Sequence, residues 1–149
     1  MRCVVQRVKG ASVSVNDEQV GRCGQGFLVL LGVHVDDTEK DLDYMARKVP
    51  SLRIFEDEEG KMNRSLKDIG GEILCVSQFT LYGDARGGNR PAFITAARRD
   101  KAEPMYQELM ERWRQQGIHV EAGIFGADMQ VSLINDGPVT ILLDSTRLF

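Results

Sequence analysis

Two apolar runs in this chain are each broken by polar residues. The run at residues 73–76 leads directly into Ser77-Gln78-Phe79-Thr80, and residues 135–140 separate the run at 131–134 from the run at 141–143. Such runs are typical of buried strands, in which an unpaired polar group or a broken backbone ladder costs about 1 to 3 kcal/mol. A chain that accepts this cost twice is expected to have built a polar site there.

The first third of the chain has the pattern of a sheet followed by one helix. Alternating valines flank residues 16–18, which predicts a hairpin, and residues 27–31 predict a strand that is buried on both faces. The spacing of apolar residues then predicts a helix that has Thr38 as its N-cap and stops at Pro50. A short strand is expected over residues 52–55.

A second helix is expected from about residue 100 onward. Asp100 and Glu103 have the spacing of a capping box, and Pro104 would fall in the first turn, where proline is tolerated. An apolar stripe then runs to Trp113, which we assign to the core, and Gly117 ends the helix.

The rest of the pattern completes the fold class. Residues 118–122 alternate as a strand, and the two runs on either side of residues 135–140 add further strands. Strands outnumber helices, and the helices interrupt them. We therefore predict one α+β domain over residues 1–149, with a curved, mainly antiparallel, barrel-like sheet and two principal helices.

Composition narrows the class of protein. Cys3, Cys23 and Cys75 are far apart and lack the spacing of a metal site, so we expect reduced thiols and no metal. The amino-terminal segment lacks the features of a signal peptide, and no run approaches the ~18 apolar residues of a membrane span. We therefore expect a cytoplasmic protein that does not enter a membrane.

The charges are unevenly distributed. A formal net charge of −3 argues against a protein that coats nucleic acid, because such binding depends on many lysine and arginine contacts to phosphate. Five cations nevertheless follow the first polar segment: Arg86, Arg90, Arg98, Arg99 and Lys101. An anionic partner would therefore meet one edge of the protein, and a solvated loop and helix start are the alternative interpretation.

The first polar segment carries the groups that an ester hydrolase needs. Two-residue alternation would place Ser77 and Phe79 on one face of the strand, and Gln78 and Thr80 on the other. Hydroxyl and amide groups can stabilise a developing oxyanion, and an aromatic ring can stack on a nucleobase. The simpler alternative is a strand that ends in polar residues before a loop.

The second polar segment contains Gly137-Pro138, and proline cannot donate a hydrogen bond to a strand ladder. The preceding Asn135-Asp136 would fit a β-turn, and from the residues alone we favour that turn. The alternative is a cis Gly-Pro bond that turns a backbone carbonyl outward, although only ~5 to 6% of X-Pro bonds are cis.

The common catalytic motifs do not occur in this chain. There is no G-x-S-x-G elbow, H-E-x-x-H or Walker lysine pattern, and neither His34 nor His119 lies in a pattern typical of a catalytic base. Catalysis would therefore depend on positioning and electrostatics.

Three segments together resemble the signature segments of the D-aminoacyl-tRNA deacylases. They are Met62-Asn63-Arg64-Ser65, residues 77–84 and residues 135–140. The similarity extends along the whole chain, from Gln6-Arg7-Val8 to residues 142–145. Separate motifs in the same order are more specific than any one of them alone.

The resemblance implies a homodimeric editing enzyme of the cytoplasm that needs no cofactor. Such an enzyme hydrolyses the ester that joins a D-amino acid, or glycine, to the acceptor end of tRNA. In this family the Gly-Pro bond is cis, and its carbonyls enter the active site of the partner subunit, where they exclude L-amino acids. The free ribose hydroxyl of the terminal adenosine helps to activate water.

The resemblance also implies roles for individual residues. The catalytic groups would be Ser77, Gln78 and Thr80. The substrate-binding groups would be Gly137, Pro138, Phe79, Phe125, Met129 and Arg7, of which Arg7 would hold the Gly-Pro segment in orientation. The loop at residues 86–90 is less basic than is common in the family, which concerns tRNA affinity more than activity.

Two alternatives remain open from the sequence. One is a dimeric protein that binds RNA ends without catalysis, which would use Phe79 and the basic residues but not Gly137-Pro138. The other is a hydrolase of small esters with Thr80 or Cys75 as its nucleophile. In the deacylase itself, Thr80 would act either as a nucleophile or as an oxyanion stabiliser.

Overall fold

The computed structural model describes residues 1–149, the whole chain. Its elements in chain order are β1 (Arg2–Val15), β2 (Glu18–Cys23), β3 (Gly26–Gly32), α1 (Glu39–Ser51), β4 (Phe55–Glu56), β5 (Met62–Arg64), β6 (Glu72–Ser77), the short 3-10 helix η1 (Phe79–Tyr82), α2 (Arg99–Gln115), β7 (Val120–Ala122) and β8 (Gln130–Asp144). The strands form a main sheet and a separate small hairpin of β4 and β5.

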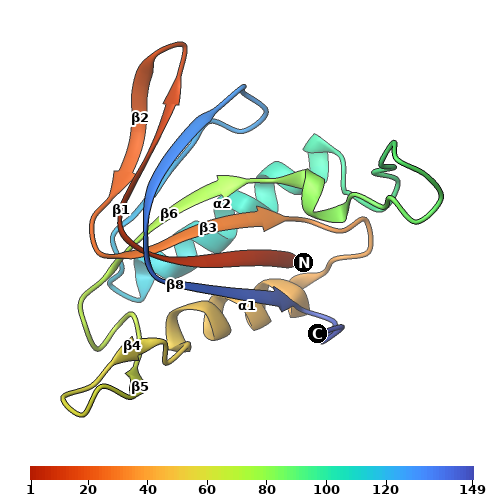
Figure 1. Cartoon of the computed structure of the whole chain (residues 1–149). Helices are drawn as coiled ribbons and strands as arrows, with labels where there is room; N and C mark the ends of the chain where they lie inside the picture. Colours follow the sequence, from red (N-terminus) through yellow and green to blue (C-terminus); the bar gives the residue numbers. More distant parts are fainter.

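The main sheet is mixed, and it curls. Strand β1 pairs antiparallel with β2, β3 and β8, whereas β6 is parallel to both β3 and β7. The parallel pair is possible because the long connection through α1 returns the chain to the same end of the sheet. The long strands β1 and β8 bend together, which gives the sheet its barrel-like form (Figure 1). The predicted fold class is therefore confirmed.

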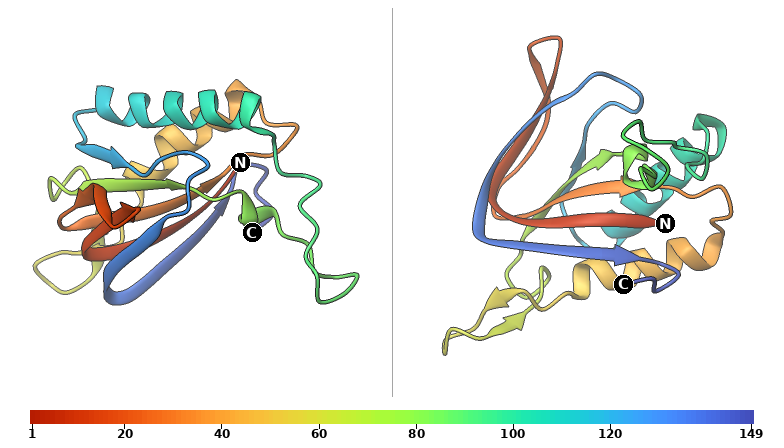
Figure 2. Two further views of the ribbon diagram at one scale, coloured as in Figure 1. Left: turned by 90° about the horizontal axis from the view of Figure 1, so that it is seen from above. Right: turned by 45° about the vertical axis from the view of Figure 1, so that its right-hand side comes forward.

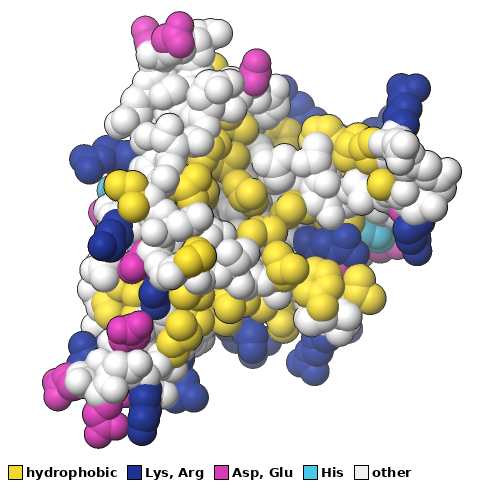
Figure 3. Space-filling view, viewed as in Figure 1, with side chains coloured by type: hydrophobic (Ala, Val, Ile, Leu, Met, Phe, Trp, Pro, Cys, Tyr) yellow, Lys and Arg dark blue, Asp and Glu magenta, His cyan; other side chains and the backbone are white.

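Both helices cover one face of the sheet and leave the other face open (Figure 2). The predicted stripes supply the core, since Met45 and Val49 of α1 and Leu109 and Trp113 of α2 are fully buried. On the open face, Leu142 and Ile134 of β8 remain 54% and 63% exposed. Hydrophobic side chains gather over the middle of this face (Figure 3).

Helix α1 begins as predicted. The Thr38 side chain accepts a hydrogen bond from the Lys40 backbone N–H, and the Asp41 side chain accepts one from the Thr38 backbone N–H. The helix includes Pro50 and ends one residue later, at Ser51. Pro50 has no N–H to donate to the Ala46 carbonyl four residues earlier, and this carbonyl instead accepts a hydrogen bond from the Gln116 side chain (Nε2, 2.9 Å).

Helix α2 and the strand after α1 differ from expectation. The predicted capping box at Asp100 and Glu103 is wrong, because α2 begins at Arg99 and Glu103 forms an ion pair with Arg99 (Nε to Oε2, 2.7 Å). Pro104 consequently lies in the second turn. The strand predicted at residues 52–55 is reduced to Phe55–Glu56, and the Ile54 carbonyl instead accepts a hydrogen bond from the Arg7 side chain.

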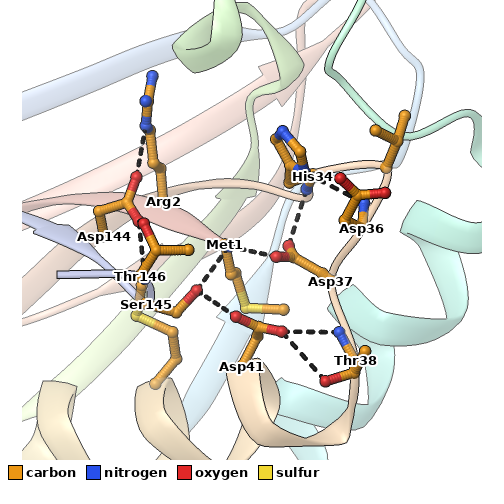
Figure 4. A network of polar contacts seen from close by, with 12 residues as sticks. Met1, Arg2, His34, Asp36, Asp37, Thr38, Asp41, Asp144, Ser145 and Thr146 are labelled. Carbon is orange, nitrogen blue, oxygen red and sulfur yellow. Dashed lines mark hydrogen bonds and ion pairs between the residues drawn. The ribbon is translucent and has the colours of Figure 1, made fainter. Parts of the chain in front are cut away.

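Hydrogen bonds and ion pairs connect the first residues of the chain and the residues at the end of β8 to the start of α1 (Figure 4). The buried Met1 ammonium donates hydrogen bonds to Asp37 Oδ1 (2.5 Å) and to Ser145 Oγ (2.7 Å). Ser145 Oγ in turn donates to Asp41 Oδ1 (2.6 Å). This network fixes the outer ends of β1 and β8 to the helix layer.

No helix of the chain is long and apolar enough to span a membrane.

Candidate active site

A cavity of about 440 Å³ lies where β6 ends. Its walls come from the ends of β3 and β6, the first half of α2, and the segment between β7 and β8. The residues that line it are Leu31, Val33, Ser77, Gln78, Phe79, Ala97, Arg99, Ala102, Tyr106, Phe125, Gly126, Ala127, Met129 and Val131. Most of this lining is hydrophobic, and its polar groups are few and convergent, as in typical ligand sites.

The polar side chains come from the point at which β6 stops. Strand β6 ends at Ser77, and the Gln78 backbone N–H still donates to the Leu31 carbonyl (2.7 Å) before η1 begins at Phe79. Because the strand stops there, the predicted two-residue alternation is wrong beyond Ser77. Ser77, Gln78 and Phe79 all line the cavity, whereas Thr80 does not, although the Gln78 amide donates a hydrogen bond to the Thr80 hydroxyl.

Aromatic rings form the opposite part of the cavity. The Phe125 ring packs against Tyr106 at 5.9 Å between centroids, and the Arg99 guanidinium carbon lies 5.6 Å from the Phe125 centroid. Phe79 is 57% exposed and contacts Phe93 edge to face at 5.1 Å. Exposed rings beside an apolar hollow can take up a flat, partly apolar ligand such as a nucleobase.

The second polar segment lies inside one long strand. Gln6 pairs with Thr140 and Val8 pairs with Asn135, so that residues 136–139 of β8 bulge opposite the single residue Arg7. The predicted β-turn is wrong, because both sides of the segment pair with the same strand and the chain does not reverse. The Gly137-Pro138 peptide bond within the bulge is cis.

Arg7 holds this bulge from inside the protein. The side chain is only 6% exposed, and it donates hydrogen bonds to the Asp136 carbonyl (Nε, 3.0 Å) and the Ile54 carbonyl (Nη1, 2.7 Å). Gly137 has φ +123°, and a Cβ there would lie 2.9 Å from Val139 Cγ2 and 3.0 Å from Arg7 Nη2. Only glycine fits this position without a shift. Gly137 and Pro138 themselves are exposed.

Within one chain the two polar segments are separate. Arg7 and Asp136 line another hollow, of about 480 Å³, together with Arg64, which comes from the small β4–β5 hairpin. Neither Gly137 nor Pro138 lines the cavity at the end of β6. Of the predicted site residues, the fold thus gathers Ser77, Gln78, Phe79, Phe125 and Met129 in one place and Arg7, Gly137 and Pro138 in another.

Histidines and cysteines lie away from this cavity. Neither His34 nor His119 lines it, and His119 Nε2 lies 2.6 Å from Glu121 Oε2. Cys75 precedes the polar segment but is fully buried, and burial raises the pKa of its thiol well above the ordinary value. Burial likewise raises the pKa of Cys3 to about 12 and that of Cys23 to about 11. Such thiols are poor nucleophiles.

Most of the basic residues after the first polar segment already form ion pairs or hydrogen bonds within the chain. Asp84 pairs with Arg86 (2.6 Å), and hydrogen bonds from Arg86 hold the pKa of Asp84 below its usual range. Arg99 pairs with Glu103, and the Lys101 ammonium donates to the Val35 carbonyl. The sequence did not identify Tyr106, Arg99 and Gly126 as cavity residues, because helical spacing assigned Tyr106 to the core, Arg99 was assigned only to the basic cluster, and nothing local marked Gly126.

Comparison with solved structures shows that other proteins share this fold. A structure titled "Structural Analysis of a probable eukaryotic D-amino acid tRNA deacylase" has the same fold, with a TM-score of 0.82 at 21% identity over 95% of this chain and 97% of that one. A second, the "c-Myc DNA Unwinding Element Binding Protein", has a TM-score of 0.91 at 47% identity over 97% of this chain and 98% of its own.

Sequence comparison gives the family. The profile of the D-Tyr-tRNA(Tyr) deacylase family matches residues 4–144. The D-aminoacyl-tRNA deacylase of Desulfitobacterium hafniense is 59% identical over the full length of both chains, and that of Thermus aquaticus is 57% identical over 99% of this chain and 97% of its own. The chain therefore belongs to the D-aminoacyl-tRNA deacylase family, whose members are ester hydrolases.

Proposed function

We propose that this chain hydrolyses the ester between a D-amino acid, or glycine, and the terminal adenosine of tRNA, and that residues 1–149 act as one catalytic domain of the cytoplasm. The observation that carries the proposal is the cavity at the end of β6. It joins the hydroxyl and amide of Ser77 and Gln78 to an apolar, aromatic wall. Phe79 and Phe125 would hold the adenosine by stacking, which is worth about 1 to 3 kcal/mol per base.

The active site is completed by a second copy of the chain. Gly137-Pro138 is exposed and lies outside its own cavity, so its carbonyls are free to enter the cavity of a partner. The uncovered face of the sheet supports this arrangement, because Leu142 and Ile134 expose apolar surface beside the bulge. Burying such surface against a second copy is favourable by roughly 25 cal/mol per Å².

Selection by handedness would come from the backbone. Arg7 holds the segment through the Asp136 carbonyl, so that a carbonyl of Gly137-Pro138 can accept a hydrogen bond from the amino group of a D-aminoacyl ester. An L-amino acid in the same pose would drive its side chain into the Gly137-Pro138 backbone. Glycine has no side chain to exclude, so glycyl-tRNA should also be hydrolysed.

The chemistry would be assisted by the substrate. The oxygen of water attacks the ester carbonyl carbon, while the free ribose hydroxyl of the terminal adenosine accepts the proton of that water and passes its own proton toward the neighbouring ribose oxygen. The oxyanion that forms is stabilised by backbone N–H groups and by the side chains of Gln78 and Thr80. Collapse of the intermediate breaks the bond to the ribose oxygen, which leaves with the relayed proton to give free tRNA and the amino acid. The Thr80 hydroxyl accepts a hydrogen bond from the Gln78 amide, and no carboxylate or histidine forms a hydrogen bond with it that would make it a nucleophile.

The phosphates next to the terminal adenosine would meet the basic edge of the site. Arg90 and Arg98 are the members of that cluster that form no ion pair or side-chain hydrogen bond within the chain. Charge reversal at both positions should weaken tRNA binding and reduce its salt dependence.

The test is amino acid release from D-tyrosyl, L-tyrosyl and glycyl tRNA by the purified protein, with a chelator present. Release from the D and glycyl substrates, but not from the L substrate, is expected. Tight binding of all three without release would instead favour the protein that binds RNA ends.

The role of Thr80 has its own test. Thr80→Ala should retain measurable deacylation, whereas a tRNA that lacks the free hydroxyl on its terminal ribose should lose most of its reactivity. The reverse pattern would assign Thr80 as the nucleophile.

A further inference from the structure

A second hollow lies along the outer side of α1, and its lining is strongly basic. It measures about 520 Å³ and is lined by Tyr44, Arg47, Lys48, Ser51, Lys67, Gln116 and Arg147. Four of these residues are cations and none is an acid. It shares no lining residue with the cavity at the end of β6.

Several separate elements build this hollow. Tyr44, Arg47, Lys48 and Ser51 lie on one face of α1, because they are three, four and seven residues apart, and they extend over about 10 Å of helix. Lys67 comes from the segment before β6 and Arg147 from the segment after β8. Arg147 has φ +59°, a left-handed conformation that is uncommon for a residue other than glycine.

The cations of the hollow are unpaired, whereas nearby cations are not. Arg112 of α2 binds Glu39 and Asp43 of α1 (2.5 and 2.6 Å), so these acids of α1 are turned toward α2. Lys48, Lys67 and Arg147 take part in no ion pair or side-chain hydrogen bond. Arg47 donates only to the Asp43 carbonyl (3.3 Å).

This arrangement is unfavourable in the free protein. The chain has 22 acidic and 19 basic side chains, so acids were available to neutralise the hollow. Like charges around one hollow repel each other, and no acid in the lining offsets this repulsion. Lys48 has a structural role as well, since a cation in the last turn stabilises a helix, but this reason does not extend to Lys67 or Arg147. A bound anion would offset the repulsion.

We propose that this hollow binds the sugar-phosphate backbone of the tRNA substrate at a distance from the acceptor end, an inference that rests on the proposed function. Four cations from three separate segments surround a hollow of about 520 Å³, and charges spread in this way suit successive phosphates better than one compact anion. Arg47 and Lys48 lie on the C-terminal half of α1, whose dipole repels anions, so the long side chains must supply the attraction. The lining offers little for reading bases, so the contact would be independent of sequence.

The distance between the two sites is limited by the size of the protein. A domain of this length is about 40 Å across, so the hollow lies no further than this from the cavity at β6 of the same protomer. A tRNA whose acceptor end occupies that cavity would have to extend over at most this distance to reach α1. On a protein with a net charge of −3, a local basic hollow would also orient the approaching tRNA.

The test compares two triple variants with the same loss of charge. The first carries Lys48→Gln, Lys67→Gln and Arg147→Gln. The control carries Lys9→Gln, Arg22→Gln and Lys61→Gln, which are exposed and lie outside both cavities. Binding of uncharged tRNA is measured against salt concentration. The hollow variant should bind more than about tenfold more weakly, with a salt slope lower by about 2 to 3, because each phosphate contact contributes about 0.7 to 0.9.

Two further measurements separate this proposal from the proposed function and from a small-anion site. Deacylation of a D-aminoacyl adenosine without the tRNA body should be the same in both variants and the unmodified chain. If no D-aminoacyl ester is hydrolysed, the proposed function fails, while the tRNA binding comparison still tests the hollow. Equal salt slopes for the two variants would overturn the proposal, as would tight binding of inorganic pyrophosphate that displaces tRNA.

Discussion

The end of β6 and the bulge in β8 interrupt apolar strands in opposite ways. At the end of β6 the strand stops, and Ser77, Gln78 and Phe79 turn their side chains toward a cavity. In β8 the strand continues, and residues 136–139 are pushed out of the ladder with Gly137-Pro138 exposed. The first region offers side chains, and the second offers backbone.

The difference shows why the two regions depend on different residues. Side chains at a strand end can vary in position, so an apolar wall with Phe125 is needed to hold the ligand against them. A backbone group can be aimed only if the segment that carries it is fixed. Buried Arg7 fixes the bulge through the Asp136 carbonyl. Substitutions in the bulge should therefore reduce activity more than substitutions at the end of β6. The most important residues of the bulge should be those that supply or hold the backbone and make no side-chain contact with the substrate.

The largest effect is expected for Gly137→Ala. The new Cβ would meet Val139 and Arg7 at a φ of +123°, so the bulge must move. Since a displacement of about 1 Å can cost 100-fold in rate, we expect D-aminoacyl-tRNA deacylation to fall by at least about 100-fold in single-turnover assays. Gly87→Ala is the matched control, because a Cβ there meets nothing within 4 Å. Similar rates for the two variants would contradict the role of the bulge.

Arg7→Ala should reduce both activity and stability. Its loss leaves the Ile54 and Asp136 carbonyls without their donor, which should lower the free energy of unfolding by about 2 to 4 kcal/mol. We expect a rate loss of about 100-fold, together with a larger relative rate on L-tyrosyl-tRNA as the bulge loosens. Arg53→Ala, at an exposed arginine, is the control in thermal unfolding and in deacylation. A stable Arg7→Ala protein with unchanged selectivity would show that Arg7 does not hold the bulge in position.

Phe125→Ala tests the side-chain region and should have a smaller effect. Loss of one stacking surface costs about 1 to 3 kcal/mol, so KM for D-aminoacyl-tRNA should rise by about tenfold with kcat nearly unchanged. Ile94→Ala, at a side chain that is 87% exposed and outside the cavity, should have no effect. A fall in kcat with constant KM would mean that Phe125 positions the reacting ester instead.

The smallest effect is expected from thiol reagents. Cys75 lies only two residues before Ser77, but all three thiols are buried, and burial keeps their pKa values far above neutrality. Deacylation should change by less than about twofold after treatment with iodoacetamide at pH 8, and its pH profile from 7 to 9 should show no thiolate ionisation. If iodoacetamide inhibited deacylation and bound substrate prevented this inhibition, the alternative of a small-ester hydrolase with a cysteine nucleophile would be favoured.

Much of the fold could be predicted because its signals are local. The stripe that ends at Trp113, the N-cap Thr38 and the hairpin at residues 16–17 each depend on residues within a few positions of each other. The predictions that were wrong had two different causes. Glu103 pairs with Arg99 four residues earlier on the same helix instead of capping α2, which is a local competition between two side-chain contacts. Arg7, in contrast, is far away in the sequence from the Ile54 carbonyl that it takes, which a longer strand would have used.

By itself, the sequence determined where the polar segments are and what chemistry they can offer, because residue type and periodicity along a strand are local properties. Tertiary structure alone decided that β8 runs on through Gly137-Pro138, since only its pairing with β1 on both sides distinguishes a bulge from a turn. It also brought Lys67 and Arg147, which are far apart in the sequence, to one hollow that no acid lines, whereas Arg86 and Arg99 pair with acids two and four residues away. Electrostatic contacts between distant segments act through space, and no local pattern records them.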